Sequence, residues 1–508
     1  MKNIRIYLIG IMTMLVIHTS CDQGFDELNV NPVQPIAVDP AFVLNQAMIT
    51  ASFAGSTLPY EMSIVQQMVT PFGGVLTGGN YNQDNRPVTR GNWDKYFRDV
   101  MRHTSAAKAA TMENTNRSNL YHMSRIINSY AAMILTDTYG EIPYFEAGKG
   151  FLEGLVNPTY DTQEAIYTDI LKELDEAATG LDAAKKTEVA DILYGGEVAK
   201  WKKLANSLLL RAAMRVAKRN TTLATQYINK AIAGGLMASN DDNAVIRHDF
   251  NYVNAVGNTL NGSETNNYYL AAPFVDHLKT TNDPRLQAIA VRYVGADSGP
   301  AQNADRANQD PVVQVGMPMG YDNASIAQVV QNLGLVSFYD FSQLDRTRMG
   351  KRDAPALLVT FAQTKLLQAD AIARGLIQGD ASTLYETGIR AHMTQLEIYG
   401  DNTVIPEAEI TDYIQVNPLT GTNDLEKINT QYWVASFLNG PEAFANFRRS
   451  GFPALTPNPF PGSEINSDFI TRLTYPDSEL SVNAENFNTA IGRQGADRLD
   501  TFLWWAKD

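Results

Sequence analysis

The sequence predicts a mainly α-helical protein in which tetratricopeptide-like helical hairpins form a scaffold with long irregular loops and a loop-rich insert. Apolar stripes at helical spacing fill two long blocks, small residues recur where two helices of a hairpin would approach, and the stretch between the blocks has no sustained period. The chain has 508 residues, 44% of them apolar, which suffices for a sizeable core. Its 35 glycines and 22 prolines are spread throughout, which indicates shaped loops between regular elements.

The N-terminus has the pattern of a secretory signal. Lys2 and Arg5 precede a mostly apolar run, residues 6–17, which is too short to span a bilayer comfortably. Cys21, the only cysteine of the chain, follows where bacterial lipoprotein signals place the residue that is acylated. His18 departs from this pattern, because such signals usually carry an apolar residue three positions before the cysteine. We expect lipidation of Cys21, which would hold the protein on a membrane surface; the alternatives are a buried free thiol or ordinary cleavage.

These signals predict the organisation of the chain. Residues 1–20 are expected to form the lipoprotein signal peptide, and residues 21–40 a lipid-anchored extended arm, because the arm contains Asp, Asn, Gly and Pro but little periodicity. Residues 41–508 are expected to form a single α-helical domain, with the loop-rich insert at about 236–345. Such an insert is too long for one connecting loop in a compact domain and is usually functional.

The first helical block covers residues 92–235. Its apolar residues recur at the spacing of one face of a helix, with acidic residues on the other faces. Asp161 and Glu164 have the spacing of a capping box and predict the start of one of these helices. The stripes are Trp93, Tyr96, Phe97 and Val100; Tyr121, Ile126, Tyr130 and Ile134; Ile166, Ile170, Leu174 and Ala177; and Trp201, Leu204, Leu208 and Ala212.

The second helical block runs from about 356 to 399 and resumes from 424 to 447. Gly375 and Gly388 are small where two helices would approach, and Tyr385 would fill the gap beside them, which is close to the tetratricopeptide pattern. Because no strict period survives along the chain, we expect several degenerate hairpins packed as a curved scaffold. The alternative is an ordinary helical domain in which this spacing arises by chance.

The charge of the chain disfavours some classes of partner. Its 41 basic and 55 acidic residues give a net charge of −14 at pH 7. Such a surface repels phosphate backbones and anionic lipid headgroups. We therefore expect no nucleic-acid binding, and contact with the membrane through the lipid anchor alone.

Motifs for catalysis and metal binding are missing from the sequence. It has no GxSxG elbow, no GxxxxGK[ST] loop and no GxGxxG turn. The histidines lack the spacing of a zinc site, and residues 240–243 offer oxygen ligands without the glycine and closing glutamate of a calcium loop. We expect no catalytic residue, no metal and no cofactor, although the 55 acids leave open a carboxylate pair for glycoside hydrolysis.

Several aromatic residues lie outside the helical periodicity and are flanked by amides and acids. This combination suits a carbohydrate site, because sugar C–H faces lie on aromatic faces while hydroxyls take directional hydrogen bonds. The alternative for each ring is packing into the nearby core. We expect the loop around Tyr81 and the insert to converge on one face of the protein. The candidate ligand-binding residues are Asn80, Tyr81, Asp84, Arg86, Tyr268, Tyr321 and Tyr339.

Seven strings, taken in order from end to end of the chain, resemble the SusD/RagB family of nutrient-binding outer-membrane lipoproteins. Each string is weak alone, but their joint occurrence is specific. Ser450 and Phe452 stand where the family more often has Thr and Tyr. The strings are FDELNVNP (25–32), TDTYGEIPYFEA (136–147), LYGGEVAKWKKLANSLLLRAAMRVAK (193–218), NDPRL (282–286), QYWVASFLNGPEAFANFRRSGFPAL (431–455), TYPDSELSVNAENFNTAI (474–491) and the terminal LWWAKD.

The resemblance implies a non-enzymatic lipoprotein that is anchored at the cell surface in the outer membrane. It further implies that the protein sits as a lid on a TonB-dependent transporter of the SusC type. The protein would deliver an oligosaccharide or, in some members, a peptide to this transporter. The family's ligand contacts lie in variable loops, so the resemblance assigns no binding position here. Two other functions stay open: a glycoside hydrolase with an unrecognised carboxylate pair, and a structural tetratricopeptide-type adaptor without a small ligand.

Overall fold

The computed structural model describes residues 38–72, 78–262, 265 and 267–507. The fold is mainly α-helical, as the sequence predicts, and its strands are short. Cys21, the expected signal peptide and most of the expected arm lie outside the described residues. No helix within those residues has both the length and the apolar character needed to cross a membrane.

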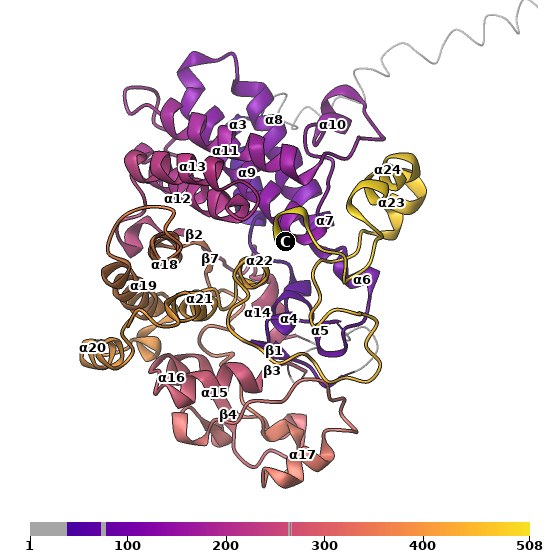
Figure 1. Cartoon of the computed structure of the whole chain (residues 1–508), viewed down its shortest axis with the longest axis vertical. Coiled ribbons are helices and arrows are strands. Elements are labelled where there is room, and N and C mark those ends of the chain that lie inside the picture. Colours follow the sequence, from indigo (N-terminus) through magenta and orange to yellow (C-terminus); the bar gives the residue numbers. More distant parts are fainter. Residues whose placement is uncertain (1–37, 73–77, 263–264, 266, 508) are drawn as a thin grey trace, which may run out of the picture.

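The first block folds into long helices that pack against one another in chain order (Figure 1). Most of α9 is buried, because neighbouring helices cover it on several sides. The helices of the block are α7 (Gly91–Asp94), the π-helix η3 (Lys95–Met101), α8 (Arg102–Thr111), α9 (Ser118–Tyr139), α10 (Lys149–Glu153), α11 (Gln163–Gly180), α12 (Val198–Val216) and α13 (Thr221–Gly234). The helix α3 (Pro40–Thr50) precedes the block and packs against α8 and η3.

The start of α11 differs in detail from the expected capping box. Thr162 is the N-cap, and its hydroxyl accepts a hydrogen bond from the amide of Ala165 at 3.3 Å. The carboxylate of Asp161 instead accepts the amides of Tyr144 and Phe145, each at 2.9 Å. The prediction of Asp161 as cap was therefore wrong, because a preceding loop takes its carboxylate.

The second block contains the hairpin that the small residues predicted. Helices α18 and α19 pack closely, and a Cβ added at Gly388 would lie 2.7 Å from Cγ of Leu366. Tyr385 is buried with 2% of its surface exposed, as expected of the ring that fills the gap. The helices are α18 (Phe361–Ala373), α19 (Ala381–Gln395), α20 (Glu407–Val416), α21 (Asp424–Ala435) and α22 (Gly440–Ser450).

The insert contains short helices and strands that the sequence did not predict. Its strands pair with distant partners: β1 with β3, β2 with β7, and β5 and β6 on either side of β4, all antiparallel. In Figure 1 most of it forms the lower end of the molecule. Its elements are β2 (Ala244–Ile246), α14 (Ala255–Leu260), β3 (Tyr269–Leu270), α15 (Ala272–Thr280), α16 (Arg285–Ile289), β4 (Ala290–Tyr293), β5 (Ala307–Asn308), α17 (Ala327–Asn332) and β6 (Gln343–Leu344). The partner strands β1 (Met68–Val69) and β7 (Ala356–Val359) lie outside the insert.

A few short helices lie between these groups. The helix α4 packs against α22, and α23 and α24 pack against each other. The contact between α4 and α22 ties the segment of residues 56–72 to the helical scaffold. The short helices are α4 (Glu61–Ile64), α5 (Gly78–Tyr81), α6 (Arg86–Thr89), α23 (Asp477–Val482) and α24 (Ala484–Gln494).

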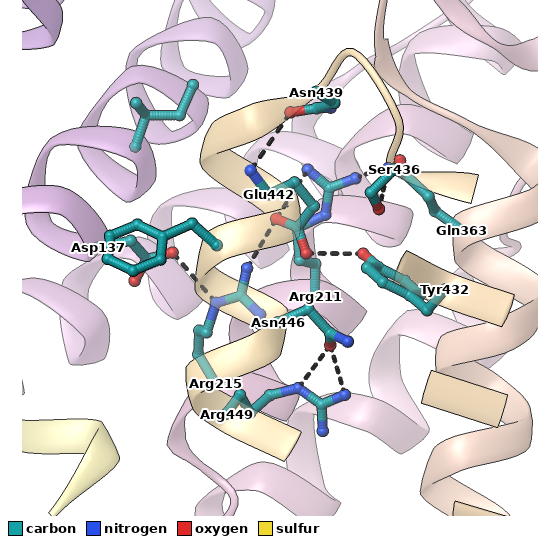
Figure 2. A network of polar contacts seen from close by, with 12 residues as sticks. Asp137, Arg211, Arg215, Gln363, Tyr432, Ser436, Asn439, Glu442, Asn446 and Arg449 are labelled. Carbon is teal, nitrogen blue, oxygen red and sulfur yellow. Dashed lines mark hydrogen bonds and ion pairs between the residues drawn. The ribbon is translucent and has the colours of Figure 1, made fainter. Parts of the chain in front are cut away.

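A buried ionic network joins the two helical blocks (Figure 2). Arg215 on α12 donates to Glu442 on α22 at 2.7 Å and to Asp137 on α9 at 3.1 Å. Tyr432 on α21 donates its hydroxyl to the other oxygen of Glu442 at 2.7 Å. Burial by itself raises the pKa of Glu442, but Arg211 and Arg215 outweigh that effect and hold the pKa below its ordinary value.

Candidate ligand-binding surface

Aromatic rings gather at the end of the molecule formed by the insert. Phe72, which follows β1, meets Phe338 edge to face with ring centroids 5.7 Å apart. The rings of Phe338 and Tyr339 lie 4.1 Å apart, and Phe338 also meets Tyr269 of β3 at 6.3 Å. Phe72, Phe338 and Tyr339 are half-buried, so each residue keeps part of its surface exposed.

The turn that carries Phe338 and Tyr339 is fixed by buried polar contacts. The carboxylate of Asp340 accepts from Nε of Arg292 at 3.0 Å and from the amide of Gly295 at 2.9 Å. The hydroxyl of Ser337 accepts the amide of Tyr339 at 3.0 Å. Because Asp340 is 2% exposed, these bonds are shielded from water and hold both rings in place.

Asn80 connects the helix α5 to the insert. Its side-chain amide donates to the carbonyl oxygens of Thr70 at 2.7 Å and of Tyr321 at 3.0 Å. Its side-chain oxygen accepts the amide of Gly320 at 2.7 Å. Asn80 is fully buried, so it acts as a connector here, and it brings the half-buried Tyr321 beside Thr70 and α5.

Tyr81 is buried, and its ring is already in contact with another ring. Its side chain is 3% exposed, and its hydroxyl donates to the carbonyl oxygen of Pro71 at 3.0 Å. The ring stacks on Phe460 with a centroid distance of 4.3 Å and an interplanar angle of 20°. Burial, with a smaller effect of Asp322, raises the pKa of the Tyr81 hydroxyl to about 12. Phe460 is half-buried, so it is the more exposed residue of this stacked pair.

Tyr268 is also buried, with 3% of its surface exposed, immediately before β3. Its carbonyl oxygen accepts from the side chain of Gln343 at 3.1 Å. The segments that carry the four predicted tyrosines thus meet at one end of the molecule, but only Tyr321 and Tyr339 are partly exposed. Ligand binding by any of these tyrosines stays a prediction.

Asp84 and Arg86 hold the C-terminal segment and do not join the rings. Arg86 contacts Asp497 at 2.8 Å and donates to the carbonyl oxygen of Tyr475 at 2.9 Å. Asp84 accepts the hydroxyl of Thr474 at 2.7 Å, and burial raises the pKa of its carboxyl. These partners give both side chains a structural role.

The half-buried rings at this end of the protein form what we call the ring surface. Sequence reasoning missed Phe72 and Phe460, although both lie outside helical periodicity near Gly or Asn, which is the signal that selected Tyr81. Their exposure could not be read from the sequence, because it depends on contacts with distant segments. The ring surface consists of Phe72, Tyr321, Phe338, Tyr339 and Phe460.

The segment of residues 240–243 forms a capped turn. The carboxylate of Asp242 accepts from Nζ of Lys203 at 2.9 Å and from the amides of Ala238 at 2.7 Å and Ser239 at 3.2 Å. These donors occupy the oxygens that a calcium ion would need. Across the part of the chain that the structure describes, no group of three or more His, Cys, Asp or Glu residues could hold a metal ion.

Comparisons with known proteins identify the family. Residues 32–476 match a family model described as "Starch-binding associating with outer membrane", the SusD-like family. A solved chitin-binding protein is 28% identical, with a TM-score of 0.82, and the match covers 92% of this chain and 100% of that one. A SusD-like protein of Bacteroidetes is 26% identical, with a TM-score of 0.80 and coverage of 93% and 100%.

A further solved structure supports the fold alone. It is a chitin-binding SusD homolog from Flavobacterium johnsoniae, 24% identical with a TM-score of 0.75, and the match covers 92% of this chain and 98% of that one. No curated protein matches the sequence. Because the family model spans most of the chain, the resemblance of the seven strings is confirmed, and the protein belongs to the SusD-like family.

Proposed function

We propose that this protein is a cell-surface lipoprotein that binds an oligosaccharide on the ring surface and delivers it to a SusC-like TonB-dependent transporter. The observation that carries the proposal is the ring surface itself. Phe338 and Tyr339 lie on a turn fixed by Asp340, so they offer a rigid aromatic platform at little cost in side-chain entropy.

The family supports carbohydrate as the ligand class. The family description names starch, and a similar solved protein, 28% identical, is named chitin-binding. The same description places the family at the outer membrane, which agrees with lipidation of Cys21 and anchoring at the cell surface. A peptide remains the second ligand class, because the rings alone do not distinguish a sugar face from an apolar side chain.

A binding role is favoured over catalysis. Asp340 accepts from Arg292 and Gly295, Asp322 accepts the amides of Ala324 and Ser325, and Glu464 accepts the amide of Asp84, so these acids near the rings are used in fixing turns. A hydrolase would need two free carboxyl groups on either side of a glycosidic bond. The proposed protein is therefore not an enzyme and uses no cofactor.

Calorimetry with soluble chito- and malto-oligosaccharides tests the ligand. We expect saturable binding to the wild-type protein and weaker binding to Phe338→Ala, because one stacked ring contributes about 1 kcal/mol or somewhat more. The matched control is Phe42→Ala on α3, a ring 60% exposed at the far end of the molecule (Figure 1). Equal affinity of both variants would contradict the ring surface as the site.

The two alternative functions give different results in the same assay. Release of shorter saccharides during the titration, detected by chromatography, would indicate a glycoside hydrolase. Binding of the transporter without binding of any saccharide or peptide would indicate an adaptor.

The transporter partner is tested separately by co-purification. Tagged protein extracted from native membranes in mild detergent should bring a TonB-dependent barrel with it, because a scaffold of helical hairpins leaves a broad face for a large contact. Repeated recovery of the protein alone would contradict the lid model while leaving oligosaccharide binding intact.

A further inference from the structure

A second site is suggested by a cleft far from the ring surface. The cleft has a volume of about 400 Å³ and lies between α7 and η3, the loop of residues 143–158, and α23. This volume falls within the range of about 300–1,000 Å³ that is typical of small-molecule sites. Figure 1 shows α7, α10 and α23 on one side of the molecule, well above α17 and β4.

The aromatic part of the cleft is made by Trp93 and Phe97, whose ring centroids lie 4.6 Å apart. Trp93 is 7% exposed and meets Tyr139 and Tyr475 edge to face at 5.3 and 5.6 Å. These contacts confirm the core role that the sequence predicts for Trp93. The indole N–H, however, has no hydrogen-bond acceptor among the residues that the structure describes.

Polar groups lie beside these rings. Glu479 lines the cleft and accepts the hydroxyl of Tyr160 at 2.7 Å, which fixes its carboxylate. Arg102 also lines the cleft and is exposed, and its guanidinium forms no hydrogen bond or ion pair within the described part of the chain. The cleft therefore offers hydrogen-bond donors and an acceptor next to an aromatic surface.

The rim of the cleft is apolar and is held by side-chain bonds. Val156 and Val482 line it and are 79% and 66% exposed. Asn483 donates to the carbonyl oxygen of Pro158 at 2.9 Å, so the loop and the end of α23 are joined. Asn486 of α24 donates to the carbonyl oxygen of Asn157 at 3.1 Å and adds a second connection. These two bonds hold the walls of the cleft to each other.

We propose that this cleft is a second carbohydrate-binding site, which takes a single pyranose unit. Sugar hydroxyls both donate and accept, so they can bond the Trp93 indole, the Glu479 carboxylate and the Arg102 guanidinium. The C–H face of the sugar packs on the half-buried Phe97, beside Trp93. Charges of both signs line the cleft, which suits an uncharged ligand. The inference rests on the proposed function for its ligand class only.

The test uses ¹⁹F NMR of protein labelled with 5-fluorotryptophan. The chain has five tryptophans, so few resonances are expected, and Trp93→Phe assigns the one of interest. Titration with chitobiose and with maltose should move the Trp93 resonance in a saturable way with at least one of them. The resonance of Trp201, which is fully buried elsewhere, should stay in place and report an intact fold.

Matched variants test whether the shift of the Trp93 resonance arises from binding in the cleft. Val482→Arg should abolish the Trp93 movement, because the long side chain fills the mouth of the cleft, whereas Val416→Arg at a 72% exposed position on α20 should not. Phe338→Ala should leave the movement unchanged, which separates this site from the ring surface. The proposal is overturned if neither disaccharide shifts the Trp93 resonance, or if only a tripeptide, titrated for comparison, shifts it. It is also overturned if the shift is as large in Val482→Arg as in the wild type, or if the shift is lost in Phe338→Ala.

Discussion

The side-chain amide of Asn80 donates to the carbonyl oxygen of Tyr321 at 3.0 Å, across a sequence separation of 241 residues. This bond joins α5 to the insert, and the amide of Gly320 donates to the oxygen of the same side chain. Two parts of the ring surface therefore depend on one fully buried asparagine.

Replacing Asn80 should disturb both stability and binding. Asn80→Ala leaves the carbonyl oxygens of Thr70 and Tyr321 and the amide of Gly320 without a partner, at about 1–3 kcal/mol for each buried group. We expect a loss of several kcal/mol in the free energy of unfolding in urea, together with weaker oligosaccharide binding. Asn116→Ala, at an exposed position in the turn Thr115–Arg117, is the control. Equal unfolding midpoints for both variants would refute the connector role.

The predicted tyrosines should separate into two groups. Tyr339→Ala should weaken oligosaccharide binding by about 1 kcal/mol with little change in stability, because its ring is partly exposed. Tyr81→Ala should cost about 3–5 kcal/mol of folding stability, because it removes a buried ring stacked on Phe460. Calorimetry and urea unfolding measure the two effects. The separation is wrong if Tyr81→Ala binds weakly while unfolding like the wild type.

The stability of the protein should depend on pH through Glu61. This carboxyl is fully buried on α4, and burial raises its pKa from 4.5 to about 7. Between these values the folded state holds a proton that the unfolded state has lost, so stability falls as pH rises through the interval. The full effect of the shift is about 3 kcal/mol.

Glu61→Gln removes this titration while keeping an oxygen that can accept from Asn92. The variant should be more stable than the wild type at pH 8, and the difference should shrink towards zero near pH 4.5. Urea unfolding across this range, with the exposed Glu113→Gln as control, checks the expectation. A constant difference between the two proteins at all pH values would show that Glu61 does not titrate in the interval.

The buried network of Figure 2 should be sensitive to the loss of its acid. Glu442→Ala removes the carboxylate that Arg211, Arg215 and the hydroxyl of Tyr432 share, so that two buried guanidinium groups keep, in the described part of the chain, a single acidic partner, Asp137, which pairs with Arg215. Removing one member of a buried ion pair costs about 3–5 kcal/mol, because the remaining charge is uncompensated. Glu113→Ala on the surface should change the unfolding free energy by well under 1 kcal/mol, as about ±0.5 is usual for such sites.

Lipidation can be tested without reference to the fold. Cys21→Ala should move the protein from the membrane fraction to the soluble fraction, because acyl chains provide about 0.8 kcal/mol of membrane affinity per buried methylene. Intact-mass analysis of the native protein should show an acylated N-terminal cysteine. An unmodified thiol at Cys21, or a mature chain that begins elsewhere, would contradict the prediction.

The sequence alone determined the fold class and the family. Helical stripes such as Ile166, Ile170 and Leu174 predict a buried face from local spacing, and these residues are fully buried in α11. Gly388 and Tyr385 predicted a close hairpin for the same reason, since a helix places residues of fixed spacing on one side. Such features depend on short stretches of chain and can be read from them.

Only the tertiary structure decided which rings reach solvent. Tyr81 is buried because Phe460 stacks on it, and Phe338 stays half-exposed because Asp340 and Arg292 fix its turn. The cleft at Trp93 likewise needs α23, far along the chain, as one of its walls. Contacts between distant segments carry no local periodic signal, so loop composition could indicate where a site lies but could not select the residues that form its surface.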